Sequence, residues 1–174
     1  MSKQIIDAMA MKRALTRITY EIIEKNKGTS QLVLVGIKTR GEFIAQRIAE
    51  QMNKLEGATV PVGALDITGY RDDQPNQAAQ SQVQGSLPVP IDDRRVVLVD
   101  DVFYTGRTMR AAMDALMDRG RPQVIQIAVL IDRGHREMPI RPDFVGKNVP
   151  TANREAIKVN MTEIDHQDMV ELIK

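Results

Sequence analysis

The sequence of 174 residues predicts a single α/β domain, 1–174, with a mostly parallel sheet covered by helices on both faces. Two observations support this prediction. Short runs of aliphatic residues without polar alternation are typical of strands that are buried on both faces. These runs alternate along the chain with amphipathic stretches of helical periodicity, which is the order expected of parallel βαβ units.

The first predicted helix covers residues 7–25, because Met11, Leu15, Ile18 and Ile22 recur at helical spacing. The later elements are predicted at strand 32–37, helix 42–55, strand 60–67, strand 96–99, helix 107–119, strand 124–131 and strand 157–161. Residues 132–150 are expected to be irregular. The tail, 165–173, is expected to form one or two helical turns.

The composition narrows the classes of function. No cysteine is present, which excludes disulfides and thiolate metal sites. No apolar run approaches the roughly 20 residues of a membrane span, and no signal segment follows Met1, so we expect a cytoplasmic protein without a membrane partner. The net charge of +1 neither predicts nor excludes a nucleic-acid partner. With no tryptophan and three residues each of Phe and Tyr, a stacking platform for single strands is not expected.

The most informative segment is a strand followed by acids, a turn and a helix. Val96–Val99 reads as the buried strand, Asp100 and Asp101 follow it, and Thr105-Gly106 precedes a helix that opens at Arg107-Thr108. In α/β sheets, ligands bind at the carboxyl ends of strands, where a helix N-terminus attracts phosphate. The two carboxylates can accept hydrogen bonds from sugar hydroxyls. The alternative is that they only cap the helix, but adjacent acids would repel each other without a ligand or cation. The segment therefore predicts a site for a ribose phosphate.

This segment resembles the phosphoribosyl pyrophosphate (PRPP) signature of the type I phosphoribosyltransferases. The resemblance rests on the run Val99-Asp100-Asp101-Val102-Phe103-Tyr104-Thr105-Gly106-Arg107-Thr108. It implies the type I phosphoribosyltransferase fold, with a flexible lid loop and a small hood. It also implies that the residues from Asp100 to Thr108 bind PRPP or its nucleotide product.

A second junction, Lys38-Thr39-Arg40-Gly41, also joins a strand to a helix through a tight turn. Lys38, Arg40 and the Thr39 hydroxyl can bind another phosphate group. Alone, such a turn is equally well explained as a solvated basic turn. In the family this position is the pyrophosphate loop, which often contains a non-proline cis peptide, so the resemblance adds Thr39, Arg40 and Gly41 to the PRPP-binding residues.

Residues 69–93 have almost no apolar periodicity, and a loop of this length is either functional or disordered. The resemblance implies a lid, with Tyr70 and Arg71 at its hinge and able to reach the pyrophosphate. Closure would exclude water from the reaction. We expect the catalytic residues to be Asp100, Asp101, Lys38 and Arg71. Mg²⁺ is the expected cofactor, held by PRPP rather than by direct protein ligation.

Three further segments resemble the bacterial pyrimidine-operon attenuation regulators, and the likeness covers nearly the whole chain. These segments are Arg13–Arg17, Asp132–Arg141 and Asp143–Asn148. The resemblance implies synthesis of UMP from uracil and PRPP, and binding of the operon's leader RNA when UMP is bound, which promotes transcription termination. The alternatives are a plain nucleobase salvage phosphoribosyltransferase without an RNA-binding role, and a regulator that binds UMP without catalysis.

An exposed helix face opposite the apolar stripe and a basic segment after the strand 124–131 are the candidate RNA surface. The expected RNA-binding residues are Arg13, Thr16, Arg17, Tyr20, Lys25, Thr39, His135, Arg136, Arg141 and Lys147. On the residues alone, an ordinary solvated surface explains them better, and the resemblance reverses this preference. The family often has histidine where Tyr20 stands. The resemblance also implies a homodimer or a higher oligomer.

In type I enzymes the segment after the signature forms a hood that reads the base, here about 132–174. Uracil needs donors for its carbonyl groups, an acceptor for N3–H and an apolar face. We expect Asp132, Arg133 and Ile157 to bind the base, with Arg133 and backbone groups supplying polar contacts and Ile157 the apolar face.

Overall fold

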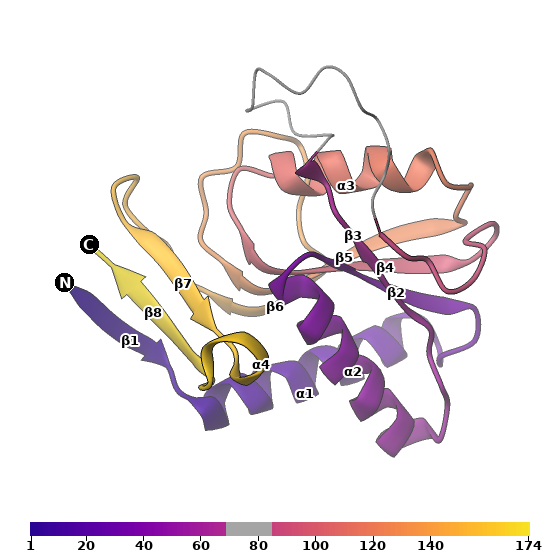
Figure 1. Ribbon diagram of the computed structural model, residues 1–174, viewed down its shortest axis with the longest axis horizontal. Coiled ribbons are helices and arrows are strands. Elements are labelled where there is room, and N and C mark those ends of the chain that lie inside the picture. Colours follow the sequence, from indigo (N-terminus) through magenta and orange to yellow (C-terminus); the bar gives the residue numbers. More distant parts are fainter. Residues whose placement is uncertain (69–84) are drawn as a thin grey trace.

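A computed structural model describes residues 1–68 and 85–174, and its centre is a five-stranded parallel sheet (Figure 1). The strand order is β3-β2-β4-β5-β6. All four neighbouring pairs are parallel, as the sequence predicts. The strands are β2 (Leu32–Ile37), β3 (Val62–Leu65), β4 (Arg95–Phe103), β5 (Val124–Asp132) and β6 (Phe144–Asn148).

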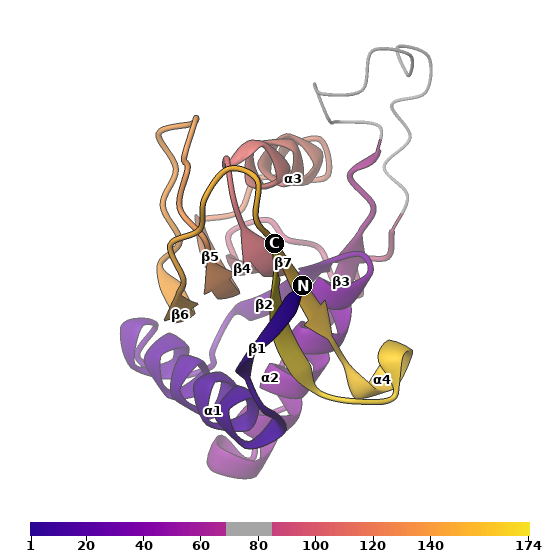
Figure 2. The ribbon, with the colours of Figure 1, turned by 90° about the vertical axis from the view of Figure 1, so that its left-hand side faces the viewer.

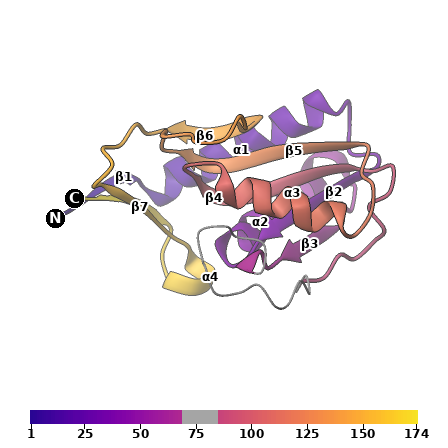
Figure 3. The same cartoon turned by 90° about the horizontal axis from the view of Figure 1, so that it is seen from above.

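Helices cover both faces of this parallel sheet (Figures 1 and 3). Helices α1 (Ala8–Lys25) and α2 (Arg40–Glu56) pack on one face, and α3 (Arg107–Met117) packs on the other. Burial on both faces explains why the strands are continuous apolar runs. The prediction of an α/β fold is confirmed. No helix in the described ranges has the length and apolar character needed to span a bilayer.

A second, antiparallel sheet is built from both ends of the chain, and we call it the small sheet. Its order is β1-β8-β7, with β1 (Ser2–Ile6), β7 (Ala156–Asn160) and β8 (Met169–Ile173), and the single turn α4 (Thr162–Asp165) lies between β7 and β8. The two termini therefore lie close together (Figure 2). The predicted helical turns in 165–173 are wrong, because β8 pairs with both β7 and β1. Strand β1 was not predicted, because it pairs with β8, about 170 residues away in the sequence.

Two predicted boundaries also change within the parallel sheet. Residues 132–150 are not wholly irregular, because β6 pairs with β5 at the sheet edge. Its Gly146 lies so close to β5 that a Cβ would come within 2.4 Å of the Leu130 carbonyl oxygen. Strand β4 continues past Val99, because Val102 and Phe103 pair with β5. Residues 69–84, with Tyr70, Arg71 and most of the predicted lid, lie outside the described residues.

Candidate functional site

Two strand-to-helix junctions lie next to each other at the carboxyl edge of the parallel sheet. One joins β2 to α2 and the other joins β4 to α3, and β2 and β4 are neighbours. Between them lies a cavity of about 350 Å³, the first cavity. Its lining residues are Ile37, Lys38, Thr39, Arg40, Asp66, Ile67, Thr68, Asp100, Asp101, Val102 and Thr108. The fold thus brings together residues from both motifs that the sequence singled out.

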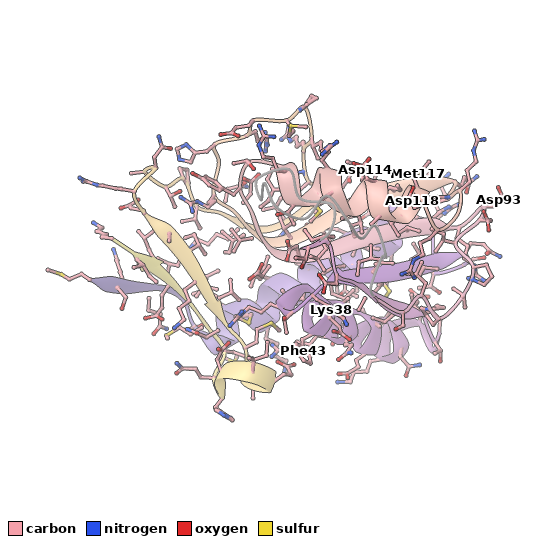
Figure 4. The ribbon with its side chains drawn as sticks, turned by 45° about the horizontal axis from the view of Figure 1, so that its top comes forward. Lys38, Phe43, Asp93, Asp114, Met117 and Asp118 are labelled. Carbon is pink, nitrogen blue, oxygen red and sulfur yellow. The ribbon has the colours of Figure 1, made fainter. Side chains whose placement is uncertain are left out.

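The β2–α2 junction is tightly fixed to the sheet. The Lys38–Thr39 peptide is cis, the feature that the resemblance associates with this loop. Only glycine fits at Gly41, because a Cβ there would lie 2.4 Å from the Val99 carbonyl oxygen of β4. The Thr39 side chain makes no capping hydrogen bond. An uncapped helix N-terminus offers N–H donors to an anion. Figure 4 shows Lys38 at this junction.

The two acids of β4 are each oriented by the next residue along the chain. The Asp101 amide donates to Asp100 Oδ1 at 2.9 Å, and the Val102 amide donates to Asp101 Oδ1 at 2.8 Å. Asp100 is buried and Asp101 is partly buried. Both carboxylates are therefore held in place at the cavity wall, where they can accept hydrogen bonds from hydroxyl groups.

The β4–α3 turn forms a second cavity of about 410 Å³, which shares Asp100, Val102 and Thr108 with the first. The rest of its lining is Phe103, Tyr104, Thr105, Gly106, Arg107, Met109 and Glu137. Gly106 has a φ of 94°, a conformation that favours glycine, and it precedes α3 without a side-chain cap. The Thr105 carbonyl accepts hydrogen bonds from the Glu137 and Met138 amides at 2.8 and 3.2 Å. The turn is therefore fixed by the segment that follows β5.

Asp66 and Thr68 were missed in the sequence, although both line the first cavity. Asp66 Oδ1 accepts hydrogen bonds from the Thr68 hydroxyl at 2.6 Å and the Thr68 amide at 3.0 Å. These bonds, with the nearby Lys38 ammonium, hold the pKa of Asp66 below its usual value. Asp66 directly follows the carboxyl end of β3, which is where a ligand-binding acid is expected. The predicted strand 60–67 included Asp66, so the residue was not recognised as a site candidate. The cavity therefore contains a third acid, opposite a lysine.

The residues expected to bind the base line neither of these two cavities in the described structure. Arg133 is buried and donates from Nε to Thr151 Oγ1 at 3.0 Å and from Nη2 to the Glu155 carbonyl at 2.6 Å. Its guanidinium also stacks on the Tyr104 ring at 4.0 Å. Tyr104 lines the second cavity, so Arg133 reaches the site through this aromatic contact.

Asp132 and Ile157 are also held by protein contacts. Asp132 is buried and accepts hydrogen bonds from the Gly134 amide at 3.0 Å and from Arg136 Nη2 at 2.9 Å. Ile157 lies in β7, opposite Leu172 of β8. Base binding by these residues remains a prediction.

Four of the expected RNA-binding residues line an open groove of about 500 Å³ along α1, which we call the α1 groove. They are Arg13, Thr16, Arg17 and Tyr20. Tyr20 is 54% exposed, which agrees with the outward face expected from its helical position. The groove presents cations, a hydroxyl and an aromatic ring beside two acids, Glu21 and Glu24, and Arg17 is paired with Glu21 at 2.8 Å.

Other expected RNA-binding residues lie where α1 contacts β6. Arg17 donates to the Val145 carbonyl at 3.2 Å, and Lys25 pairs with Asp143 at 3.1 Å. Lys147 lies on β6, and Arg141 precedes that strand. This region is therefore continuous with the C-terminal half of α1.

The remaining three expected RNA-binding residues lie near the cavities. Thr39 lines the first cavity. The His135 ring meets the Tyr104 ring edge-on at 5.8 Å, and Arg136 pairs with Asp132. The expected RNA-binding set is thus divided between the α1–β6 region and the rim of the two cavities.

Comparison with known proteins agrees with this geometry. The phosphoribosyl transferase domain family matches residues 1–164. The chain is 62% identical to "Bifunctional protein PyrR 2" of Lactiplantibacillus plantarum, over 99% of both chains. It is 63% identical to "Bifunctional protein PyrR" of Latilactobacillus sakei, over 100% of this chain and 99% of the relative.

Solved structures with the same fold have much lower sequence identity. A hypoxanthine phosphoribosyltransferase from Staphylococcus aureus is 18% identical with a TM-score of 0.74, over 99% of this chain and 91% of the other. The hypoxanthine phosphoribosyltransferase of Trypanosoma cruzi is 15% identical with a TM-score of 0.76, over 99% and 96%. These likenesses show the fold alone. The family match and the full-length relatives establish that the chain belongs to the phosphoribosyl transferase family and, within it, to the bifunctional PyrR proteins.

Proposed function

We propose that the protein transfers the phosphoribosyl group of PRPP to uracil in the two adjoining cavities. We also propose that the α1–β6 region, which includes the α1 groove, binds the leader RNA of the pyrimidine operon when UMP is bound. Membership of the PyrR family confirms the function expected from the sequence, a pyrimidine-operon regulator that is also a uracil phosphoribosyltransferase. The assignment of individual residues is our proposal. The observation that carries it is the meeting of the Lys38–Gly41 and Asp100–Thr108 segments around one cavity.

The second cavity suits the 5′-phosphate, and the first suits the ribose and the diphosphate. At the β4–α3 turn, the N-terminus of α3 and the Thr105 and Thr108 hydroxyls can donate to the phosphate. Asp100 and Asp101 accept hydrogen bonds from the 2′- and 3′-hydroxyls. Lys38 and the N-terminus of α2 bind the diphosphate. Because the two cavities share three residues, one molecule of PRPP can occupy both.

Transfer requires no protein nucleophile. The bond from C1′ to the diphosphate oxygen breaks, uracil N1 forms the new bond to C1′, and the N1 proton is lost. The ribose ring becomes positively charged as the bond breaks, and the diphosphate becomes more negative. Asp100 and Asp101 favour the first charge, and Lys38 favours the second, so the contribution of the protein is largely electrostatic.

The donor set of the first cavity suits Mg²⁺ carried by the diphosphate. Asp66, Asp100 and Asp101 supply the carboxylate oxygens that this ion prefers. Across residues 1–68 and 85–174, no group of three or more His, Asp or Glu side chains is arranged to hold a metal by itself. When bound, Mg²⁺ would neutralise charge on the leaving diphosphate.

The direct test is to incubate the purified protein with radiolabelled uracil, PRPP and Mg²⁺ and to measure UMP. A parallel panel of hypoxanthine, guanine and xanthine separates uracil transfer from purine salvage. We expect UMP formation that depends on PRPP and transfer to uracil alone. Transfer to a purine, or no transfer to any base, would contradict the proposed reaction.

A further inference from the structure

Helix α2 is joined to the small sheet and its α4 turn at two points, through two arginines spaced two turns apart. These arginines are Arg40 and Arg47. Arg47 is held by two acids from the segment between β7 and β8. Its guanidinium donates to Glu163 at 2.6 and 2.8 Å and to Asp168 at 2.8 and 2.9 Å. Its side chain is only 22% exposed. This pair of bidentate contacts fastens the small sheet to α2 away from the cavities.

The first arginine, Arg40, makes a similar attachment from the first residue of α2. Its Nε donates to the Val159 carbonyl of β7 at 2.7 Å. Its Nη2 donates to both carboxylate oxygens of Asp165 at 3.1 and 3.2 Å. Asp165 in turn accepts a hydrogen bond from the Met161 amide at 2.8 Å, which fixes the start of the α4 turn. Arg40 therefore holds both a strand of the small sheet and α4.

The position of Arg40 distinguishes it from Arg47, because Arg40 also lines the first cavity beside Lys38 and Thr39. The backbone around it has little freedom. A Cβ at Gly41 would meet β4, and a Cβ at Gly36 would lie 2.3 Å from the Glu42 Cα of α2. The start of α2 thus packs directly on two strands of the parallel sheet. A change in the Lys38–Gly41 loop can pass to the small sheet through the Arg40 side chain.

We infer that Arg40 is a positioning residue that couples occupation of the Lys38–Gly41 loop to the docking of β7 and α4. This inference rests on the proposed function, since it takes the loop to bind the diphosphate. A diphosphate that orders the loop holds Arg40 in the geometry that contacts Val159 and Asp165, and the docked small sheet in turn favours diphosphate binding. Such coupling is reciprocal by thermodynamic necessity. Ile157, expected to contact the base, lies two residues before Val159 on β7, so the coupling extends to the strand expected to contact uracil.

The chain offers a matched pair of variants to test this role. Asp165→Asn weakens the attachment at the loop, and Glu163→Gln weakens the attachment at Arg47. Amide hydrogen exchange in β7 and β8 is measured for the wild type and both variants, with and without Mg²⁺ and inorganic pyrophosphate. We expect pyrophosphate to slow exchange in the wild type and in Glu163→Gln, although the starting rate in Glu163→Gln is faster. In Asp165→Asn the slowing is lost.

Steady-state kinetics provide a second readout on the same variants. We expect the KM for PRPP to rise about fivefold in Asp165→Asn with a smaller change in kcat, and to stay unchanged in Glu163→Gln. If Asp165→Asn does not fold, Arg40→Lys replaces it, because lysine keeps the charge but cannot make both contacts. The inference would be overturned if pyrophosphate slowed amide exchange fully in Asp165→Asn, or if both variants lost this slowing equally. A wild-type protein that forms no UMP would instead contradict the proposed function.

Discussion

The parallel sheet and the small sheet are built from the sequence in different ways. In the parallel sheet, each strand is a local apolar run, and the chemical groups follow directly at its carboxyl end, as Asp100 and Asp101 do in β4. In the small sheet, β1 and β8 come from opposite ends of the chain. Ion pairs from Arg40 and Arg47 attach it to α2. The residues that we propose for phosphate and ribose binding therefore follow local strand signals, whereas the small sheet, which carries Ile157, depends on long-range assembly.

The largest expected effect comes from the acids of the parallel sheet. Asp101→Asn keeps the shape of the side chain but removes the charge that favours the positive ribose ring. We expect kcat for UMP synthesis to fall about 100-fold, with leader-RNA binding retained. Asp114→Asn is the control, since Asp114 lies on α3 away from the Lys38 junction (Figure 4) and is exposed. An unchanged rate of UMP synthesis in Asp101→Asn would show that the Asp101 carboxylate does not stabilise the positive ribose ring.

The second effect concerns Gly106 in the β4–α3 turn, which we propose binds the 5′-phosphate. Gly106→Ala places a Cβ 3.2 Å from Met138 Cβ in a backbone with a φ of 94°. We expect the free energy of unfolding to fall by about 1 kcal/mol and the KM for PRPP to rise about tenfold. Gly28→Ala is matched to it, because Gly28 has a φ of 117° and a Cβ there would meet nothing within 4 Å. Equal KM values in the two variants would show that the turn does not hold the phosphate.

The third effect is a difference in acid sensitivity between the two sheets. The Arg47 hydrogen bond lowers the pKa of Glu163, and at Asp168 the bonds from Arg47 and Thr162 outweigh the opposing effect of burial. A carboxylate whose pKa is lower in the folded state stabilises that state above its unfolded pKa of about 4. This stabilisation is lost as the pH falls through the folded value.

We therefore expect β8 amides to lose protection from hydrogen exchange before β4 amides as the pH is lowered from 7 to 3. Arg47→Met, which keeps an apolar stem, should destabilise the small sheet by about 2 kcal/mol at pH 7 and remove most of its acid dependence. Coincident loss of protection in both sheets of the wild type would show that the ion pairs do not set the stability of the small sheet.

The smallest effect lies on the α1 groove. Arg13→Gln should weaken leader-RNA binding a few-fold and lower the salt slope by about one, as expected when one phosphate contact is lost. Arg17→Gln should also reduce thermal stability, because Arg17 donates to β6 carbonyl groups. Filter binding at several salt concentrations and thermal unfolding separate these roles. If Arg13→Gln leaves the salt slope unchanged, the groove is not part of the RNA surface.

The parts of the fold that could be predicted from the sequence are those with local signals. The apolar run before Asp100 predicts a strand and a binding site at its carboxyl end. The apolar run 32–37 predicts the position of Lys38 in the same way. Strand β1 could not be predicted in this way, because it pairs with β8 at the other end of the chain, and β8 is placed between β7 and β1 only once the sheet is assembled. Asp66 was missed because its strand ends two residues earlier than its apolar pattern.

Side-chain roles were harder to predict than positions. The sequence predicts Arg40 to be a cation beside a phosphate site, but it does not predict that its guanidinium contacts Asp165 and Val159. Arg133 likewise reaches the site by stacking on Tyr104. Such contacts depend on which elements pack together, and a single sequence carries no local signal for them.

In the function that we propose, UMP bound at the parallel sheet controls RNA binding on the same protein. The most direct test is titration of the purified protein with its own pyrimidine-operon leader RNA, with and without UMP, at two salt concentrations. We predict tight, sequence-specific binding that UMP strengthens at both concentrations. Weak binding that ignores UMP and disappears with salt would contradict the claim and leave only the transferase.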